Sequence, residues 1–282
     1  MNSRDIRVQN QRSWDAVVSA HVSHHRDVPG FLRQGGSSLF PEELALLGEI
    51  KQQRVVHMLC NAGLDTLSLA NHGAIVHGVD ISGVAIAQAQ AWATASGIDA
   101  TFEQADIYDW LAGTPLRFDR AYTGYGAICW LPDLAEWAQG VARILTPGGR
   151  FVLMEFHPFS NMFDGNYRLM RDYPQAGRSL TLHGIDDYVA HSDGGLTPTG
   201  FVDGVRDFTN TEPCTLFQWG VGEVITALAQ AGLIIESVQE YCFSNGERPF
   251  ADMVAESGRR MVTPPHLPRF PLLYGIAARK GA

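Results

Sequence analysis

Short apolar runs alternate along the chain with longer segments whose apolar residues recur every three or four positions. Five short segments predict strands, and they cover residues 55–59, 74–79, 101–105, 118–123 and 151–156. The first is an apolar run of the kind buried on both faces of a parallel sheet. Helical periodicity lies between them, most clearly over residues 84–96 and 131–145. Strands and helices in alternation predict an α/β fold with a doubly wound, mostly parallel sheet.

The chain outside this part carries three further helical patterns and two more strands. Helices are predicted over residues 11–26, 41–50 and 216–230, and strands over residues 233–241 and 271–278. Residues 30–38 and 245–269 are rich in Gly or Pro and predict loops. The leading helix either packs on the sheet or closes over a site as a lid, and its pattern leaves both open.

Residues 160–213 form a long polar stretch with several Tyr, His and Asp residues. A structureless loop of that length is uncommon inside a compact domain. We therefore expect an inserted lid or a small antiparallel subdomain here, placed over the site and deciding the choice of substrate.

Residues 54–80 form one strand-turn-helix-turn-strand unit that ends in Asp80. The first turn, Cys60-Asn61-Ala62-Gly63, consists of small residues and lets a ligand approach the backbone closely. A carboxylate at the tip of the second strand can accept both hydroxyls of a ribose. A dinucleotide fold would show Gly-x-Gly-x-x-Gly in this turn, so the single Gly63 disfavours a nicotinamide oxidoreductase.

This unit resembles motif I of the class I S-adenosylmethionine-dependent methyltransferases, usually apolar-Asp/Glu-apolar-Gly-x-Gly-x-Gly. In that register His57 stands at the acidic position, Leu59 and Asn61 at the first two glycines, and Gly63 at the third. The run is similar to a branch of the family with the motif His-Leu-x-Cys-x-x-Gly-x-Asp-Thr-Leu-Ser-Leu-Ala. Residues 80–89 also fit the family's Asp-x-Ser-x-x-x-Ile/Leu-x-x-Ala pattern, and 145–149 its Leu-x-Pro-Gly-Gly turn.

The resemblance implies a seven-stranded, Rossmann-like methyltransferase fold with an antiparallel last strand, and S-adenosyl-L-methionine as the cofactor. The residues expected to contact the cofactor are Leu59, Cys60, Asn61, Gly63, Asp65, Thr66, Asp80, Ile81, Ser82, Asp106, Ile107, Thr123 and Gly124. Asp106 follows the third strand, where the family has an acid against the adenine amino group. That position favours a ligand contact over the alternative role of a helix cap.

Methyl transfer needs a positioned nucleophile, exclusion of water and, where the nucleophile carries a proton, a base. His157 follows the fifth strand and is the candidate base, because histidine titrates near neutrality; the alternative is a hydrogen bond to loop backbone. Tyr125, between two glycines, is expected to shape the methyl channel. The residues expected to contact the substrate are Trp14, His21, Tyr125, His157, Tyr167 and Tyr188.

Other polar residues have simpler interpretations. His57, near the end of a buried strand, is expected to be a core side chain rather than a catalytic group. Glu155 either orients His157 or the cofactor amine, or is a solvated or capping carboxylate. The His and Asp residues of 183–191 are irregularly spaced, so no metal site is expected.

Composition narrows the class of protein further. The 282 residues are 45% hydrophobic and carry a formal charge of −9, which opposes binding along a nucleic-acid backbone. The four cysteines are scattered and indicate neither a disulfide framework nor a zinc site. The polar first residues and the absence of a long apolar run predict a protein without membrane contact, in the cytoplasm.

Together these features predict a methyltransferase that acts on oxygen or nitrogen of a small-molecule metabolite by in-line transfer. The expected organisation is N-terminal helices, partly a lid (1–53), a cofactor-binding core (54–159), a substrate-binding insertion (160–215) and a C-terminal completion of the sheet (216–282). The alternative is an inactive protein that binds or senses S-adenosylmethionine, because two motif glycines are replaced. The acceptor is not predicted, and a homodimer stays open.

Overall fold

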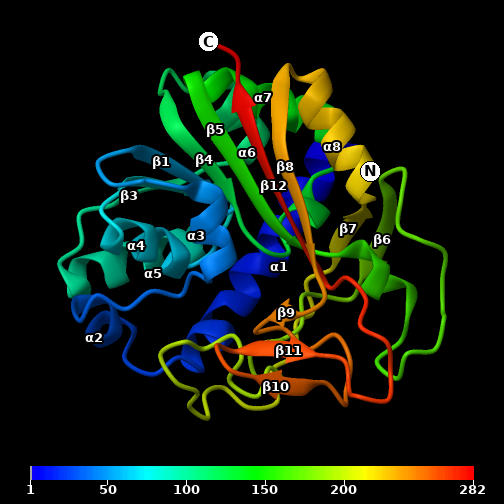
Figure 1. Cartoon of the computed structure of the whole chain (residues 1–282). Coiled ribbons are helices and arrows are strands. Elements are labelled where there is room, and N and C mark those ends of the chain that lie inside the picture. Colours follow the sequence, from blue (N-terminus) through cyan, green and yellow to red (C-terminus); the bar gives the residue numbers. More distant parts are fainter. Residues whose placement is uncertain (1) are drawn as a thin grey trace.

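The computed structural model describes residues 2–282, so residue 1 of the first predicted segment lies outside the described residues. A seven-stranded sheet forms the centre, with strand order β3-β2-β1-β4-β5-β12-β8 (Figure 1). The strands are β1 (Arg54–Met58), β2 (Ile75–Asp80), β3 (Thr101–Gln104), β4 (Phe118–Thr123), β5 (Leu145–Phe156), β8 (Leu233–Tyr241) and β12 (Leu273–Lys280). The predicted α/β class with a seven-stranded, mostly parallel sheet is confirmed.

The first five strands of this sheet run parallel, and β12 runs antiparallel between β5 and β8. Val55, Val56 and Met58 of β1 are fully buried, as expected of a central strand covered on both faces. In a sheet of this topology ligands bind at the carboxyl ends of the strands where the order reverses, here between β1 and β4. That edge is therefore where the site must be sought.

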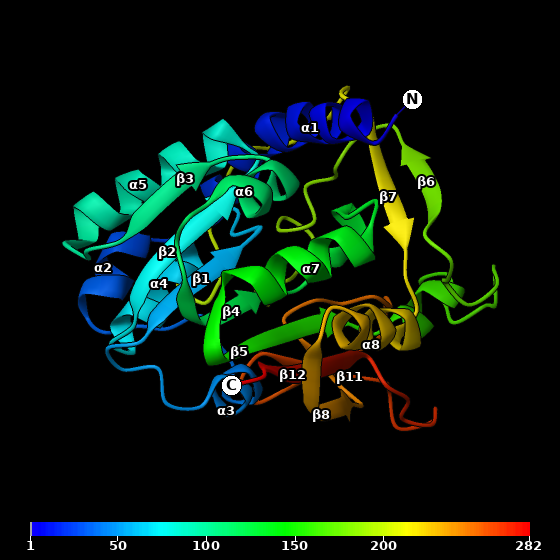
Figure 2. The same ribbon diagram turned by 90° about the horizontal axis from the view of Figure 1, so that it is seen from above.

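Helices cover both faces of the sheet (Figures 1 and 2). One face carries α6 (Ile107–Gly113), α7 (Leu134–Ile144) and α8 (Val221–Gln230), whose apolar residues share a core with β1, β4 and β5. The other face carries α2 (Val28–Arg33), α3 (Pro41–Leu47), α4 (Leu64–Asn71) and α5 (Gly83–Ser96). This doubly wound arrangement follows from the alternation of strands and helices along the chain.

The N-terminal helix α1 (Ser3–Ser23) begins at a capping box formed by Asn2 and Asp5. It lies beside β7 (Cys214–Gln218) in Figure 2, and the side chain of Asn10 exchanges two hydrogen bonds with the backbone of Thr215. The predicted helix over 216–230 is therefore wrong in its first turn, because residues 214–218 extend to pair with β6 (Arg178–Leu182) and α1.

Two smaller sheets lie outside the central one. β6 and β7 pair antiparallel within the predicted insertion. The insertion begins at the 3-10 helix η2 (Pro158–Met162), and its remainder is mostly turns. In the segment predicted as a loop over 245–269, β9 (Ser244–Asn245), β10 (Val254–Glu256) and β11 (Arg260–Val262) form a three-stranded sheet, seen low in Figure 1. Helix α2 likewise replaces part of the loop predicted over 30–38.

Candidate active site

The loop that follows β1 has an unusual backbone. Leu59, Asn61 and Gly63 all have positive φ, at 54°, 49° and 77°. These are the three positions that align with the motif glycines, so the chain keeps the glycine-type backbone at two positions that carry side chains. Asn tolerates this region, whereas Leu does so only under strain of about 1–2 kcal/mol. Such strain persists where the surrounding structure imposes it, typically at functional sites.

Asp80, at the tip of β2, is held against this loop. Its Oδ2 accepts a hydrogen bond from the backbone N–H of Asn61 at 2.8 Å, and its Oδ1 accepts one from that of Ser82 at 2.9 Å. Burial raises the pKa of Asp80 to about 6, although both N–H groups lower it. Each carboxylate oxygen keeps a second lone pair, so the group still has acceptor capacity toward a ligand.

Helix α1 contacts the tips of β2 and β3 through two carboxylates. Arg7 forms an ion pair with Asp106, while the other oxygen of Asp106 caps α6 by accepting from the N–H of Tyr108 at 2.9 Å. Asp15 accepts a hydrogen bond from the hydroxyl of Ser82 at 2.6 Å. The alternative cap role of Asp106 is thus present, and any adenine contact would require Arg7 to move.

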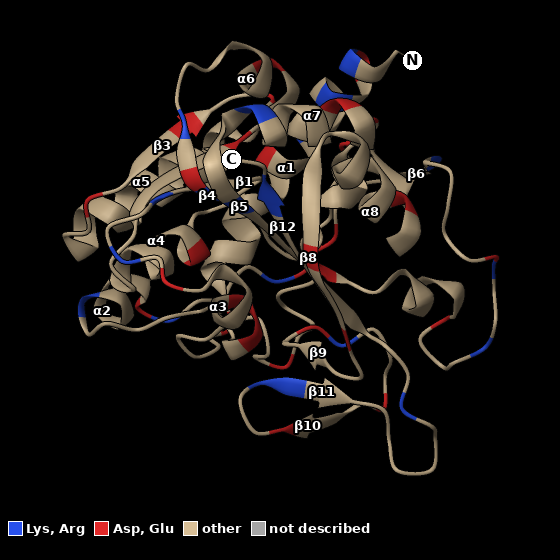
Figure 3. Ribbon diagram, turned by 45° about the horizontal axis from the view of Figure 1, so that its top comes forward, with Lys and Arg blue, Asp and Glu red and all other residues tan. Residues whose placement is uncertain are grey.

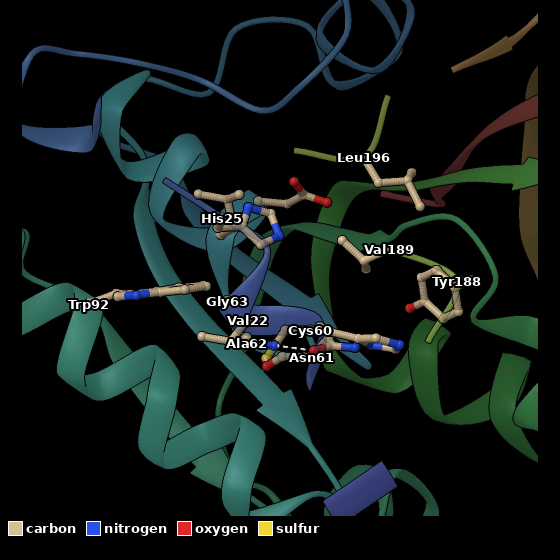
Figure 4. Close-up of a pocket in the computed structure, with 13 residues that line it drawn as sticks. Val22, His25, Cys60, Asn61, Ala62, Gly63, Trp92, Tyr188, Val189 and Leu196 are labelled. Atoms are coloured by element: carbon tan, nitrogen blue, oxygen red, sulfur yellow. Dashed lines mark hydrogen bonds between the residues drawn. The ribbon is translucent and has the colours of Figure 1, made fainter. Parts of the chain in front are cut away.

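A cavity of about 200 Å³ opens beside the β1 loop. Figure 4 shows Cys60, Asn61, Ala62 and Gly63 along its floor, with Trp92 of α5 at one end and Tyr188 at the other. Its remaining walls are His21, Val22, His25, Leu64, Asp65, Val189 and Leu196. Asp80 lies directly behind this floor, bonded to Asn61.

The roof of this cavity joins α1 to the insertion. The Nε2 of His24 and the carboxylate of Asp187, both buried, are hydrogen-bonded at 2.9 Å. The ring of His21 packs against that of Tyr188 with centroids 4.2 Å apart, and its Nε2 lies 3.0 Å from the carbonyl oxygen of Asp186. The leading helix and the insertion therefore form one continuous cover.

A second cavity, of about 120 Å³, adjoins the first and shares Leu64, Asp65 and Leu196 with it. Its other lining residues are Ser38, Phe40, Glu43, Tyr125, Phe156, Pro198, Asn245 and Arg259. Tyr125 comes from the loop after β4 and Glu43 from α3. The cavity therefore lies over the β4 and β5 tips, next to the one over β1.

Glu43 is 1% exposed and faces four other polar groups. Its pKa is raised to about 8, first by burial and then by the charge of Asp65, while the hydroxyls of Tyr125 and Tyr122 lower it. The hydroxyl of Tyr125 donates to Glu43 and accepts from the amide of Asn245 at 2.9 Å. Arg259 completes the set, with its guanidinium 4.3 Å from the centroid of Phe40.

Glu155 organises the loop after β4. Its carboxylate accepts from four backbone N–H groups, those of Gly126, Ala127, Ile128 and Phe156, at 2.5 to 3.2 Å. Burial nevertheless raises its pKa to about 7. Of the roles open to this residue, the cap is the one present, since the side chain is buried rather than solvated.

The predicted base, His157, lies away from both cavities. Its Nε2 is 2.9 Å from Glu240, and its Nδ1 accepts from the N–H of Phe159 at 3.1 Å. Burial lowers its pKa, while Glu240 raises it. This geometry matches the alternative role, a hydrogen bond to the following loop. It leaves neither ring nitrogen free to take a proton from a methyl acceptor.

The remaining predicted residues divide into three groups. Those that line a cavity are Cys60, Asn61, Gly63, Asp65, His21, Tyr125 and Tyr188. Those in or beside the loops at the strand ends are Leu59, Thr66, Asp80, Ile81, Ser82, Asp106, Ile107, Thr123 and Gly124. Two lie elsewhere: Trp14 packs on Trp130, and Tyr167 stacks on Phe250 in the aromatic cluster beside the small sheet.

His57 is a buried core side chain, as expected. Its Nδ1 lies 2.9 Å from the hydroxyl oxygen of Thr66, and burial lowers its pKa to about 4. It therefore stays uncharged and cannot replace the acid of motif I as a charged contact. Its neighbour Thr66 is fully buried and holds the ring in place.

Sequence patterns missed several residues that line the cavities: Glu43, Asn245, Arg259, His25, Trp92 and Leu196. Glu43 carried a signal, since it stands in the first turn of a helix, but that pattern indicates only a favourable helix dipole. Asn245 and Arg259 belong to a segment without regular periodicity. No local pattern could have placed them beside Tyr125.

These buried groups predict how stability depends on pH. The folded pKa values of Glu43 and Glu155 lie above the ordinary 4.5, so the folded chain binds protons that the unfolded chain releases. Lowering the pH from 8 to 6.5 should therefore raise the free energy of unfolding by about 2 kcal/mol. Below pH 6.5 the gain should level off, because His57 and His25, with pKa lowered to about 4, stay neutral while the unfolded chain protonates, which offsets the two carboxylates.

Urea unfolding at half-unit pH steps measures this dependence. Glu43→Gln should flatten the alkaline side, since glutamine does not titrate, whereas Glu49→Gln at an exposed position should not. A free energy of unfolding that stays constant from pH 8 to 6.5 would contradict the raised carboxylate pKa values.

Within residues 2–282, no helix combines the length and the apolar character needed to cross a bilayer. In the same residues, no cluster of three His, Cys, Asp or Glu side chains is arranged to hold a metal ion.

Comparison with known proteins identifies the central segment. The family described as "Methyltransferase domain" matches residues 55–149. An ubiquinone biosynthesis O-methyltransferase of Alkalilimnicola ehrlichii is 29% identical over 119 residues, which are 42% of this chain and 48% of the relative. An uncharacterized methyltransferase of Synechocystis sp. is 33% identical over 132 residues, 46% of this chain and 60% of the relative. The chain thus spans about half the length of the curated relatives it matches.

Similarity to solved structures extends over more of the chain. The crystal structure of an S-adenosylmethionine-dependent methyltransferase from Mesorhizobium loti superposes with a TM-score of 0.53 and 24% sequence identity, covering 87% of this chain and 99% of that one. At this identity the likeness shows a shared fold. It supports the central sheet and helices as described above.

Proposed function

The chain belongs to the class I S-adenosylmethionine-dependent methyltransferase family, and from this premise we propose that it transfers a methyl group to oxygen or nitrogen of a small molecule. The observation that carries the proposal is the β1 loop. Its three motif positions keep left-handed backbone, and the carboxylate of Asp80 lies against them. This is the arrangement needed to hold a nucleoside and a sulfonium over the strand ends.

The residues present fit the cofactor of the family, S-adenosyl-L-methionine. A Cβ at Gly63 would meet Ala89 and the ring of Phe102 at 2.7 Å, so the loop can pass there only as glycine. We assign Asp80 to the ribose hydroxyls and the loop of Cys60, Asn61 and Gly63 to the amino-acid end. The cofactor supplies an activated methyl group on a sulfonium.

The protein's own residues supply orientation. Glu155 fixes the loop after β4 through the N–H groups of Gly126, Ala127 and Ile128, next to Tyr125. The cover made of α1 and the insertion forms one wall of the first cavity through His21, Val22, Tyr188 and Val189. Positioning of reactants in this way accounts for much of the rate of such a transfer.

A small-molecule acceptor is supported by the charge and the size of the cavities. The chain is acidic overall, and Lys and Arg are scattered rather than gathered along one face in the view of Figure 3. A nucleic-acid partner would need a continuous basic surface. The adjoining cavity of about 120 Å³ suits a compact acceptor.

Incubation of the full chain with methyl-labelled S-adenosylmethionine and an extract of small metabolites tests the proposal. We expect label in a low-molecular-weight product and none in added RNA or DNA. Binding of the cofactor without any labelled product would support the inactive sensor instead. The sequence suggested that second candidate through the replaced motif glycines, Leu59 and Asn61, but both positions keep the left-handed backbone of glycine.

A further inference from the structure

The second cavity contains two buried hydrogen-bond acceptors that nothing in residues 2–282 satisfies. These are Oε2 of Glu43 and Oδ1 of Asn245, on residues that are 1% and 2% exposed. Leaving such a buried group unpaired is unfavourable. A ligand that donates to both atoms would recover that free energy.

The hydroxyl of Tyr125 fixes which atoms are free. It donates its one hydrogen to Oε1 of Glu43, so it can only accept from Asn245, whose Nδ2 lies 2.9 Å away. While Glu43 is ionised, its second carboxylate oxygen and the amide oxygen of Asn245 are therefore both left as acceptors. A matching ligand must present two donors close together.

The walls of the cavity suit a flat apolar body. The ring of Tyr125 lies 5.4 Å from that of Phe156 and 6.3 Å from that of Phe40, measured between centroids. Leu64, Leu196 and Pro198 complete the apolar lining. The volume of about 120 Å³ approaches that of an engineered cavity, about 150 Å³, that holds one benzene ring.

The charges facing Glu43 come from Asp65 on α4 and Arg259 near the small sheet, with the hydroxyls of Tyr122 and Tyr125 from β4 and its loop. Arg259 also donates to the carbonyl oxygens of Ser38 and Gly195, at 2.8 and 3.1 Å. Asp65 and Arg259 balance one another. With Glu43 protonated the cavity is neutral and Oε2 carries the proton, so it donates. A hydroxyl both donates and accepts and suits the site in either state, whereas an ammonium cation only donates.

We propose that this cavity seats the methyl acceptor and that Glu43 takes the acceptor's proton. The acceptor is an uncharged single-ring molecule with two neighbouring donors, such as vicinal hydroxyls. The inference rests on the proposed function. In the step, the acceptor O–H bond breaks, the proton moves to Oε2 of Glu43, and the electron pair stays on the oxygen. That oxygen forms the bond to the methyl carbon, and the sulfonium C–S bond breaks with its electron pair left on sulfur.

Glu43 is a base only after it loses its proton. The kcat/KM for methylation should therefore rise with pH up to about 8, where the pKa of Glu43 lies. Glu43→Gln should remove this rise and lower kcat/KM at least a hundredfold, while Glu49→Gln on the exposed end of the same segment should match the native chain.

Binding is tested separately from turnover by calorimetry and saturation-transfer NMR on the full chain saturated with S-adenosylhomocysteine. We expect catechol to bind about tenfold more tightly than phenol, and benzylamine to bind weakest. Glu43→Gln and Asn245→Ala should each weaken catechol at least tenfold, with unchanged affinity for S-adenosylhomocysteine and with melting curves that show a folded protein.

Two results would overturn the inference while leaving the proposed function in place. One is binding of S-adenosylhomocysteine without binding of catechol. The other is catechol affinity that is equal in the native chain and in both folded variants, or lower than that of benzylamine. If S-adenosylhomocysteine itself fails to bind, the proposed function falls first, and the inference with it.

Discussion

Asp80→Asn should weaken binding of S-adenosylhomocysteine about a hundredfold. The carboxylate lies at the tip of β2 and already accepts from the N–H groups of Asn61 and Ser82. Two further hydrogen bonds from ribose hydroxyls to a charged acceptor contribute about 3 kcal/mol, which asparagine loses because its amide is uncharged and half donor. At 1.4 kcal/mol for each factor of ten, this is about two orders of magnitude.

Calorimetric titration of the variant and the native chain gives this ratio directly. Asp99→Asn is the matched control, because Asp99 is exposed on the turn between α5 and β3 and far from the loop of β1. A melting curve shows that Asp80→Asn remains folded. Equal affinity in the native chain and in Asp80→Asn would remove the assignment of Asp80 to the ribose.

Gly63→Ala should lower the free energy of unfolding by about 2–4 kcal/mol. A Cβ at this position would lie 2.7 Å from the Cβ of Ala89 and from the ring of Phe102, both packed in the core beside α5. Overpacking of this kind costs about 1–3 kcal/mol. The positive φ of 77° adds about 1 kcal/mol for any side chain.

Gly97→Ala separates these two causes. Gly97 ends α5 at φ 72°, and a Cβ added there would meet no atom within 4 Å. It should therefore lose only the backbone part, about 1 kcal/mol. Urea unfolding of both variants measures the difference, and equal losses would show that the contact with Ala89 and Phe102 does not limit the loop.

The central sheet could be predicted from the sequence because its inner strands, such as β1, are buried on both faces and mostly apolar, and helical patterns separate most of its strands. The runs at β4 and β8 were located to the residue. β7 could not be found, because its extended conformation depends on pairing with β6 and on the side chain of Asn10, some two hundred residues away in the chain. The small sheet of β9, β10 and β11 was also missed. Its strands are only two or three residues long, which is too short for a periodic pattern.

The candidate site divides in a similar way. The loop of β1 and Asp80 carry a local pattern, and the structure brings them together. Glu43, Asn245 and Arg259 meet only through the fold, so no spacing in the sequence could relate them. His157 was favoured by its place after β5, but its ring turns toward Glu240 at the far side of the strand.

The central claim is that a nucleoside with a sulfonium lies over the carboxyl ends of the first strands. Isothermal calorimetry of the full chain with S-adenosylhomocysteine, with NADH as the comparison ligand, tests it most directly. The account predicts one-to-one binding of S-adenosylhomocysteine and no heat with NADH. No measurable binding of S-adenosylhomocysteine, or preferential binding of NADH, would contradict it.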